Sequence, residues 1–276
     1  MPVNRFLRSR SGRLRLWPLL IFGGFFAVYY FTHQENVPVT GRSQLVDISP
    51  EQEAALGLQS YREILGQADV VQGGEAVETV RMIGRRLAAV AEDPGFEWEF
   101  NVIDSEQVNA FALPGGKVAV FTGLLPVAGN DDALAVVMGH EIAHAIARHG
   151  AERMAHQKLT QYGALAVGVA MGEMDIQTQR MVMGALGVGA QYGVLMPFSR
   201  KHESEADYIG LLYVARACFD PTEAPALWER MAEGGEAPAE FLSTHPNPAT
   251  RIGNFEEWMP EALRVREEHC AESTAP

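Results

Sequence analysis

Two histidines and a glutamate lie close together in the middle of the chain, in the order His140-Glu141-x-x-His144. Histidines four residues apart on a helix lie on one face, a turn above each other, so both imidazoles can reach one metal ion. Zinc suits two imidazoles and a carboxylate, and Glu141 can act as a general base beside it. The pattern predicts one catalytic zinc ion per chain. The alternative is an amphipathic helix that carries surface histidines.

The residues around this pattern have the features of a helix. Asn130 suits the N-cap position, and Asp131 and Asp132 suit the first turn. Apolar residues recur with helical spacing over residues 134–146. Gly139 would let another element approach closely. We expect one helix that continues through three residues suited to its C-terminal half: Arg148, His149 and Arg153.

A second charged stretch offers the third metal ligand. Glu203 and Asp207 are four residues apart and share a helical face, whereas Glu205 points away. If Glu203 binds the metal, Asp207 can accept a hydrogen bond from the free N–H of a ligand histidine. Spacing does not exclude Glu205 as the ligand, and a solvated charged face is the alternative to both. We expect this helix to begin near Ser199, which suits its N-cap.

Two short strands are predicted immediately before the histidine helix. They occupy residues 109–123 and are joined at the turn Pro114-Gly115-Gly116. An extended peptide can add to the exposed edge of such a strand, which would hold its scissile bond over the metal. An ordinary core hairpin is the alternative. Residues 117–122 are one candidate for the substrate strand, and the other, which we prefer, comprises Asn109, Ala110, Phe111 and Ala112.

The order of predicted helices and strands along the chain indicates an α+β fold that is mainly α, with a small sheet beside the site. Residues 96–102 alternate as in a half-buried strand. Residues 160–197 are rich in small residues and predict closely packed helices; a mobile flap or a shallow membrane contact is the alternative. Other helices are expected over about 49–67, 77–90, 220–234 and 255–269.

The charges are unevenly distributed along the 276 residues. The net charge is −13, although five arginines precede the first acid, Glu35. The acidic body argues against nucleic acid as a partner.

The two cysteines, Cys218 and Cys270, form no metal-like pair, so zinc must be held without thiolate. A disulfide between them and two separate thiols are both open.

An apolar run from Leu16 to Phe31 follows the arginines. A membrane span takes about 20 residues, so this run needs its flanking residues to cross a bilayer. We expect an uncleaved signal anchor with the body of the protein outside the cytoplasm. A cleaved signal peptide and a mitochondrial presequence are the alternatives. The expected parts are a basic segment and transmembrane anchor (1–34), a linker (35–48) and a zinc metallopeptidase domain (49–276).

Taken together, these segments resemble the zinc metallopeptidase family that includes HtpX, the CAAX prenyl endopeptidase and Oma1. The resemblance covers about residues 40–260, and the compact length and single anchor look like the Oma1-like bacterial branch. It implies a gluzincin fold with His140, His144 and Glu203 on zinc, and so selects Glu203 over Glu205. The matching pieces are His140-Glu-x-x-His144, Glu203-x-x-x-Asp207, Asn109-Ala-Phe-Ala-x-Pro-Gly-Gly, and Ser243-Thr-His245-Pro with Arg251.

The resemblance also implies that His245 lies close to the metal. Pro246 and Pro248 stiffen its loop. His245 could stabilise the oxyanion of the tetrahedral intermediate, or act as a fourth zinc ligand that keeps the enzyme latent. A surface histidine is the alternative. Arg251 either holds this loop by pairing with an acid or faces the intermediate itself.

By analogy with the family, the expected function is a membrane-anchored zinc endopeptidase that hydrolyses misfolded or misassembled envelope proteins. Its expected location is the bacterial inner membrane, with the catalytic domain on the periplasmic side; the mitochondrial inner membrane is the alternative. Two other hypotheses are a zinc-stabilised chaperone that binds unfolded clients without cutting them, and a scaffold with a vestigial site. Glu141 argues against the chaperone, because a structural zinc needs no base.

Overall fold

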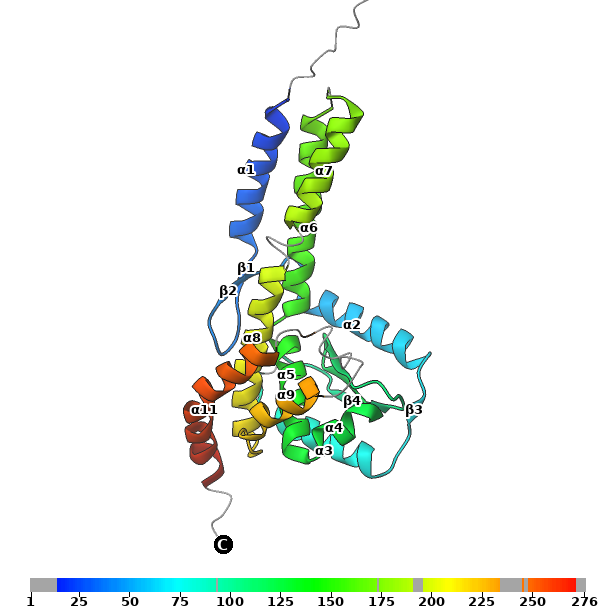
Figure 1. Ribbon diagram of the computed structural model, residues 1–276, viewed down its shortest axis with the longest axis vertical. Coiled ribbons are helices and arrows are strands. Elements are labelled where there is room, and N and C mark those ends of the chain that lie inside the picture. The colour runs from blue at the N-terminus through cyan, green and yellow to red at the C-terminus, as the bar shows by residue number, and fades with distance from the viewer. Residues whose placement is uncertain are drawn as a thin grey trace, which may run out of the picture. The chain divides into compact units, whose positions relative to one another are not determined.

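The computed structural model describes residues 14–92, 94–172, 174–190, 196–233, 245 and 248–271 (Figure 1). The described residues belong to two compact units. The smaller unit lies within residues 1–35, 45–47 and 152–198, and the larger one within residues 36–44, 48–151 and 199–276. The candidate metal ligands and the candidate general base lie in the larger unit.

The larger unit contains a four-stranded sheet with the strand order β3-β4-β6-β5. β4 (Glu99–Ile103) runs parallel to β6 (Lys117–Phe121), while β3 (Val70–Val71) and β5 (Ala110–Leu113) are antiparallel to their neighbours. β5 and β6 are the two strands predicted before the histidine helix. Among the described strands β5 pairs only with β6, so β5 is an edge strand.

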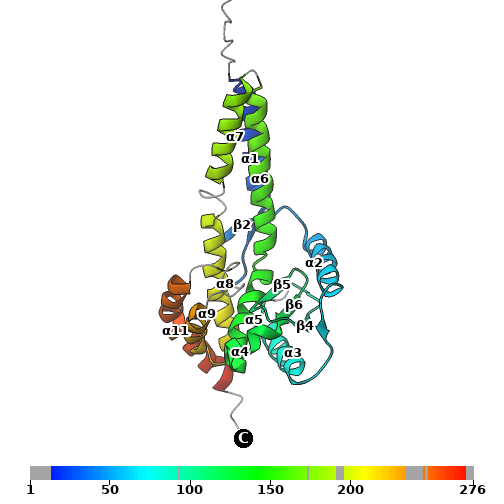
Figure 2. The same ribbon diagram turned by 45° about the vertical axis from the view of Figure 1, so that its right-hand side comes forward.

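Helices cover both faces of this sheet. One face packs against α3 (Glu75–Ala88) and α5 (Asp131–Ile146), in a core that includes Val102, Val118 and Val120. The other face packs against α2 (Pro50–Leu65) through a cluster around Tyr61. Figure 2 shows α5 beside β5. The other helices described in this unit are η1 (Thr122–Leu124), α4 (Leu125–Ala128), most of α8 (Met196–Arg216), α9 (Glu223–Glu233) and α11 (Pro248–Cys270).

Two helix starts form as the sequence indicates. Ser49 and Gln52 form a capping box at the start of α2. The side chain of Asn130 accepts a hydrogen bond from the Ala133 N–H at 2.8 Å and caps α5.

Several helix boundaries differ from the prediction; α9, for example, begins at Glu223 and not at residue 220. The histidine helix is not continuous: α5 ends at Ile146 and α6 (His149–Ala170) begins after a break, where Arg148 has a φ of 56°. α8 begins at Met196 and not at Ser199, and α11 begins at Pro248, seven residues before the expected start. Pro197 and Pro248 lie in the first turns of these helices, where proline costs no hydrogen bond. The segment that contains Arg251 is therefore helical.

Cys218 and Cys270 form a disulfide, with their Cα atoms 5.8 Å apart. It links the residue that follows α8 by two positions to the last residue of α11. Of the two possibilities that the sequence left open, the structure has the bonded pair.

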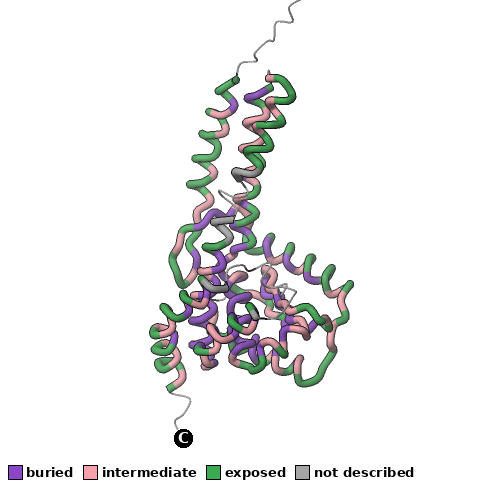
Figure 3. The backbone as a smooth tube through the Cα atoms, viewed as in Figure 1, coloured by how far each residue is buried: buried purple, intermediate pink, exposed green. Residues whose placement is uncertain are grey.

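The smaller unit consists mainly of α1 (Trp17–Thr32), the part of α6 after residue 151, and α7 (Ile176–Ala190). Helices thus fill most of the small-residue region 160–197, as predicted. A short sheet of β1 (Gln34–Asn36) and β2 (Ser43–Leu45) follows α1 in the chain. Figure 3 shows that most residues of α1 and α7 are exposed or half-buried. None of the described helices combines the length and apolar character needed to cross a membrane.

Candidate active site

The two helices that carry the candidate ligands cross in close contact. Gly139 on α5 and Gly210 on α8 lie at the crossing: a Cβ atom on Gly210 would lie 2.7 Å from the backbone nitrogen of His140. The close approach expected at Gly139 is therefore confirmed. Because α5 is buried on nearly all sides, His140 is buried and His144 is half-buried, so neither is an exposed surface histidine.

Four side chains converge at this crossing. The Nε2 atoms of His140 and His144 are 3.1 Å apart; Glu203 Oε2 lies 3.5 Å from the first, and Glu203 Oε1 lies 3.5 Å from the second. With His245 added, one donor atom from each of the four groups lies within 4.8 Å of the other three. Ligand atoms at 2.0–2.2 Å from a tetrahedral zinc ion lie about 3.3–3.6 Å apart, so the distances among His140, His144 and Glu203 are close to those of a zinc site.

Glu205 lies outside the cluster. Its carboxylate accepts hydrogen bonds from Thr40 Oγ1 at 2.6 Å and from Arg42 Nε at 2.8 Å, and lies 3.1 Å from His149 Nε2. The geometry therefore favours Glu203 over Glu205, a choice that spacing had left open.

Asp207 fixes the orientation of His140. Its Oδ1 accepts a hydrogen bond from His140 Nδ1 at 2.9 Å, which leaves the lone pair of Nε2 for a metal. Arg251 also donates to Asp207, with 2.6 Å from its Nε to Oδ2. Burial alone would raise the pKa of Asp207, but the Arg251 guanidinium and the bond with His140 outweigh it and hold this pKa below its ordinary value. Asp207 is therefore ionised.

Arg251 joins several parts of the site from the first turn of α11. It is 2% exposed, lies 3.5 Å above the ring of Trp228, and approaches Glu203 at 3.5 Å. Its Nη1 also donates to the carbonyl of His245 at 3.4 Å. Of the two roles that the sequence left open for Arg251, these contacts favour the one of holding the loop by pairing with acids.

Glu141 points towards the cluster and is only partly satisfied. Its Oε2 accepts a hydrogen bond from the Ala112 N–H of β5 at 3.2 Å. Its Oε1 is buried and has no hydrogen-bond partner among the described residues; His245 Nε2 lies 3.6 Å away. Burial raises the pKa of Glu141 to about 7. A carboxyl group with this pKa can take up and release a proton near neutral pH.

The expected substrate strand lies beside this carboxyl group. Ala110, Phe111 and Ala112 form the first three residues of the edge strand β5, and the carbonyl of Asn109 accepts a bond from the Phe121 N–H at 3.0 Å. The Ala112 contact places the free edge of β5 next to Glu141. His245 lies at the cluster, whereas its neighbours 241–244, 246 and 247 lie outside the described residues.

The sequence placed His149 in the C-terminal half of the histidine helix and gave it no role in the site, although its Nδ1 lies 2.9 Å from the Nδ1 of His144. On a continuous helix, residues five apart differ by about 140° in direction and do not meet. Only the break at Arg148 brings the two rings together, and no local pattern predicted that break. Burial lowers the pKa of His149 to about 4, so the ring is neutral.

Comparison with known proteins identifies the enzyme family. The model of peptidase family M48 matches residues 76–259, a range that contains the ligand cluster, Glu141 and β5. The chain belongs to peptidase family M48. It is therefore a zinc-dependent metallopeptidase, and its His-His-Glu-His cluster can bind the metal ion.

Relatives of this M48 enzyme occur in mitochondria and in bacteria. It is 42% identical to the mitochondrial metalloendopeptidase OMA1 of Schizosaccharomyces pombe, over 93% of this chain and 75% of the relative. It is 32% identical to the mitochondrial metalloendopeptidase OMA1 of Homo sapiens, over 96% of this chain and 54% of the relative. It is 30% identical to the beta-barrel assembly-enhancing protease of Escherichia coli, over 80% of this chain and 46% of the relative.

Proposed function

We propose that His140, His144 and Glu203 bind the zinc ion and that Glu141 is the general base. The observation that supports this assignment is the buried Oε1 of Glu141, which has no hydrogen-bond partner among the described residues and lies beside the group formed by the two Nε2 atoms and the Glu203 carboxylate. Zinc, when bound, polarises the scissile carbonyl and activates water. Glu141 then accepts the proton of the attacking water and passes it to the leaving amine, and Asp207 holds the ring of His140.

The outer edge of β5, where the Ala112 N–H donates to Glu141, is the proposed substrate site. Asn109, Ala110, Phe111 and Ala112 would pair with an extended peptide through backbone hydrogen bonds. This mode of binding needs no particular substrate sequence and requires the substrate to be locally unfolded. It therefore suits misfolded or misassembled proteins as substrates.

His245 is the proposed gate of the site. Its position in the four-group cluster supports a resting state in which its imidazole would be a further ligand of bound zinc. Access of substrate then requires the loop to move. Arg251, which donates to the His245 carbonyl, would stabilise the closed position.

We also propose that the enzyme acts at a membrane, outside the bacterial cytoplasm, on misassembled envelope proteins. One relative is named a beta-barrel assembly-enhancing protease. The disulfide suits an oxidising compartment. The mitochondrial inner membrane is the alternative location, since other relatives are named mitochondrial.

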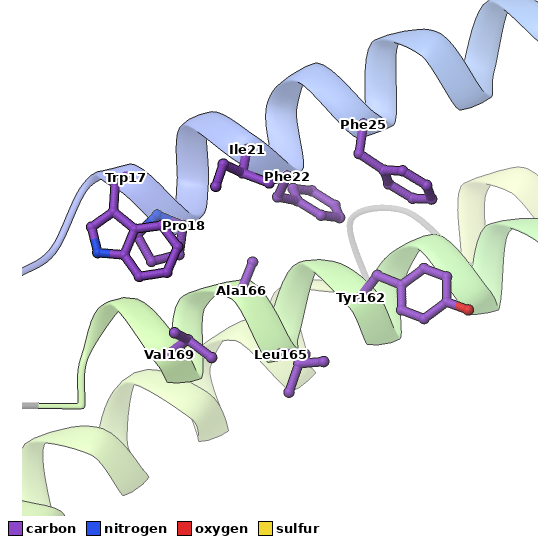
Figure 4. A pocket seen from close by; sticks show the side chains of 9 residues that line it. All are labelled: Trp17, Pro18, Ile21, Phe22, Phe25, Tyr162, Leu165, Ala166 and Val169. Carbon is purple, nitrogen blue, oxygen red and sulfur yellow. The ribbon is translucent and has the colours of Figure 1, made fainter.

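The exposed apolar residues of the smaller unit support the membrane attachment. In α1, Leu20 is 75% and Phe31 is 77% exposed, and in α6, Leu165 is 66% exposed. Figure 4 shows apolar side chains of α1 and α6 lining a shared groove, with Phe25 facing Tyr162. Large exposed apolar surfaces of this kind mark contact with a membrane or a partner. We propose that α1 and its flanking residues form the anchor.

The proposed activity is tested with the purified full chain and casein as an unfolded substrate. We expect cleavage that phenanthroline abolishes and added zinc restores. Glu141→Gln should bind casein without cleaving it, and clients trapped by this variant in cells can be identified by mass spectrometry. Cleavage that survives both the chelator and Glu141→Gln would contradict the proposal.

A further inference from the structure

The second metal-site histidine, His144, has a supporting contact of a different kind from that of His140. A carboxylate holds His140 directly, through Asp207. His144 instead meets a second imidazole, with 2.9 Å between its Nδ1 and the Nδ1 of His149. Since the Nε2 of His144 faces the metal cluster, its Nδ1 carries the proton and donates to His149.

This assignment fixes the protons along a chain of hydrogen bonds. His149 accepts at Nδ1, so its Nε2 carries a proton and donates to Glu205 Oε2 at 3.1 Å. Glu205 in turn accepts from Thr40 Oγ1 at 2.6 Å and from Arg42 Nε at 2.8 Å. Each donor in the chain therefore has an acceptor.

The side chains of this hydrogen-bond series lie in a packed environment. His149 is 1% exposed, and its ring stacks on that of His202 with the centroids 4.2 Å apart and the planes 8° apart. The side chain of Arg148 fixes the break before His149, through bonds to Glu53 Oε2 at 2.7 Å and to the carbonyl of Ile48 at 2.8 Å. A side chain held on all sides in this way can set the direction of its neighbour.

The far end of the chain of bonds is the segment 37–42 between β1 and β2. This segment is closed by bonds from the Val37 N–H to the Arg42 carbonyl and from the Gly41 N–H to the Val37 carbonyl. Val37 is 1% exposed and belongs to the main core of the larger unit. The segment is therefore part of the packed structure around the site.

We propose that segment 37–42 positions the zinc ligand His144 through Arg42, Thr40, Glu205 and His149. The proposal rests on the proposed role of His144 as a ligand. Glu205 and His149 act as positioning residues: they hold the ring of His144 in the tautomer and direction that zinc requires. The structure of segment 37–42 consequently sets the affinity of the site for zinc.

The test measures the zinc dissociation constant of the full chain by competition with a chromophoric chelator. His149→Phe keeps a flat ring but has no acceptor, and should weaken zinc binding about 10–100-fold. His149→Gln can accept from His144 and donate to Glu205, and should restore most of the affinity. Arg42→Met should weaken binding in the same direction, by about threefold or more.

Arg216→Met is the matched control. Arg216 pairs with Glu92 at 2.6 Å, and its side chain is 24% exposed. Arg42 is similar, with 2.8 Å to Glu205 and a side chain that is 28% exposed. Among the described contacts, Arg216 makes no bond to Thr40, Glu205 or His149. It should leave zinc affinity unchanged. If His149→Phe does not fold, the proposal is tested with Arg42→Met alone. Wild-type zinc affinity in Arg42→Met, or in a folded His149→Phe, would overturn the proposal, while loss of zinc in His144→Ala would still support the ligand assignment.

Discussion

Gly210 on α8 lies directly against the backbone of His140 on α5. A Cβ atom at Gly210 would come within 2.7 Å of the His140 nitrogen and 2.8 Å of the Gly139 carbonyl carbon. The two helices approach this closely because neither has a side chain at the crossing. The crossing brings Glu203, two turns earlier on α8, to the two histidines of α5.

Replacing Gly210 with alanine should therefore push the two helices apart. We expect Gly210→Ala to lower the free energy of unfolding by about 1–3 kcal/mol, the usual cost of overpacking, and to weaken zinc binding. Gly253→Ala is the matched control, since a Cβ there meets nothing within 4 Å. Urea denaturation of both variants, followed by zinc titration, makes the comparison. Equal behaviour of the two variants would show that the crossing tolerates a methyl group.

The ligand assignment predicts two classes of variant. Glu141→Gln should keep about one zinc ion per chain and lose peptide hydrolysis, because Glu141 is a base and not a ligand. His140→Ala, His144→Ala and Glu203→Ala should lose the metal. Metal analysis by mass spectrometry, together with peptide hydrolysis, separates the classes. The assignment would be wrong if Glu205→Ala lost more zinc than Glu203→Ala.

The proposed gate predicts a gain of activity. His245→Ala should retain zinc and cleave a small unfolded peptide faster, because nothing then competes for the fourth position. Zinc content and initial rates are the measurements. A loss of about 10²–10³ in turnover with zinc retained would instead identify His245 as an oxyanion donor. Wild-type rates would exclude both roles.

The disulfide predicts a loss of stability without loss of the metal. Cys218 and Cys270 are 52 residues apart, and opening a loop of this size costs about 2–4 kcal/mol of unfolding free energy. The double variant Cys218→Ser, Cys270→Ser should show this loss in urea denaturation and keep its zinc. A reducing agent should lower the melting temperature of the native chain and leave that of the double variant unchanged.

The membrane anchor predicts that one charge in the middle of α1 releases the protein. Gly24→Arg introduces a guanidinium where a side chain meets nothing within 4 Å, at a cost of about 2.5–3.5 kcal/mol in a bilayer centre. The fraction in the membrane pellet after carbonate washing should fall. Gly253→Arg, at an equally open glycine of α11, is the control and should stay in the pellet. Retention of both variants would contradict the anchor.

Much of the site follows from neighbouring residues alone. Spacing placed His140, Glu141 and His144 on one helix, Asn130 indicated where it begins, and Gly115-Gly116 separated β5 from β6. These features are local: a helix period, a cap or a turn depends on residues a few positions apart, so the sequence carries them directly.

The tertiary structure decided the remaining features, because they depend on which distant segments pack together. Local spacing allowed both Glu203 and Glu205 to bind metal; the geometry separates them, since segment 37–42, more than 160 residues earlier, binds Glu205. The local pattern predicted that the helix would continue through Arg148. The break there is instead stabilised by a bond from the Arg148 side chain to Glu53, which lies 95 residues away in the sequence. The disulfide likewise requires the C-terminal ends of α8 and α11 to lie close together. No pattern of neighbouring residues predicts the distance between Cys218 and Cys270.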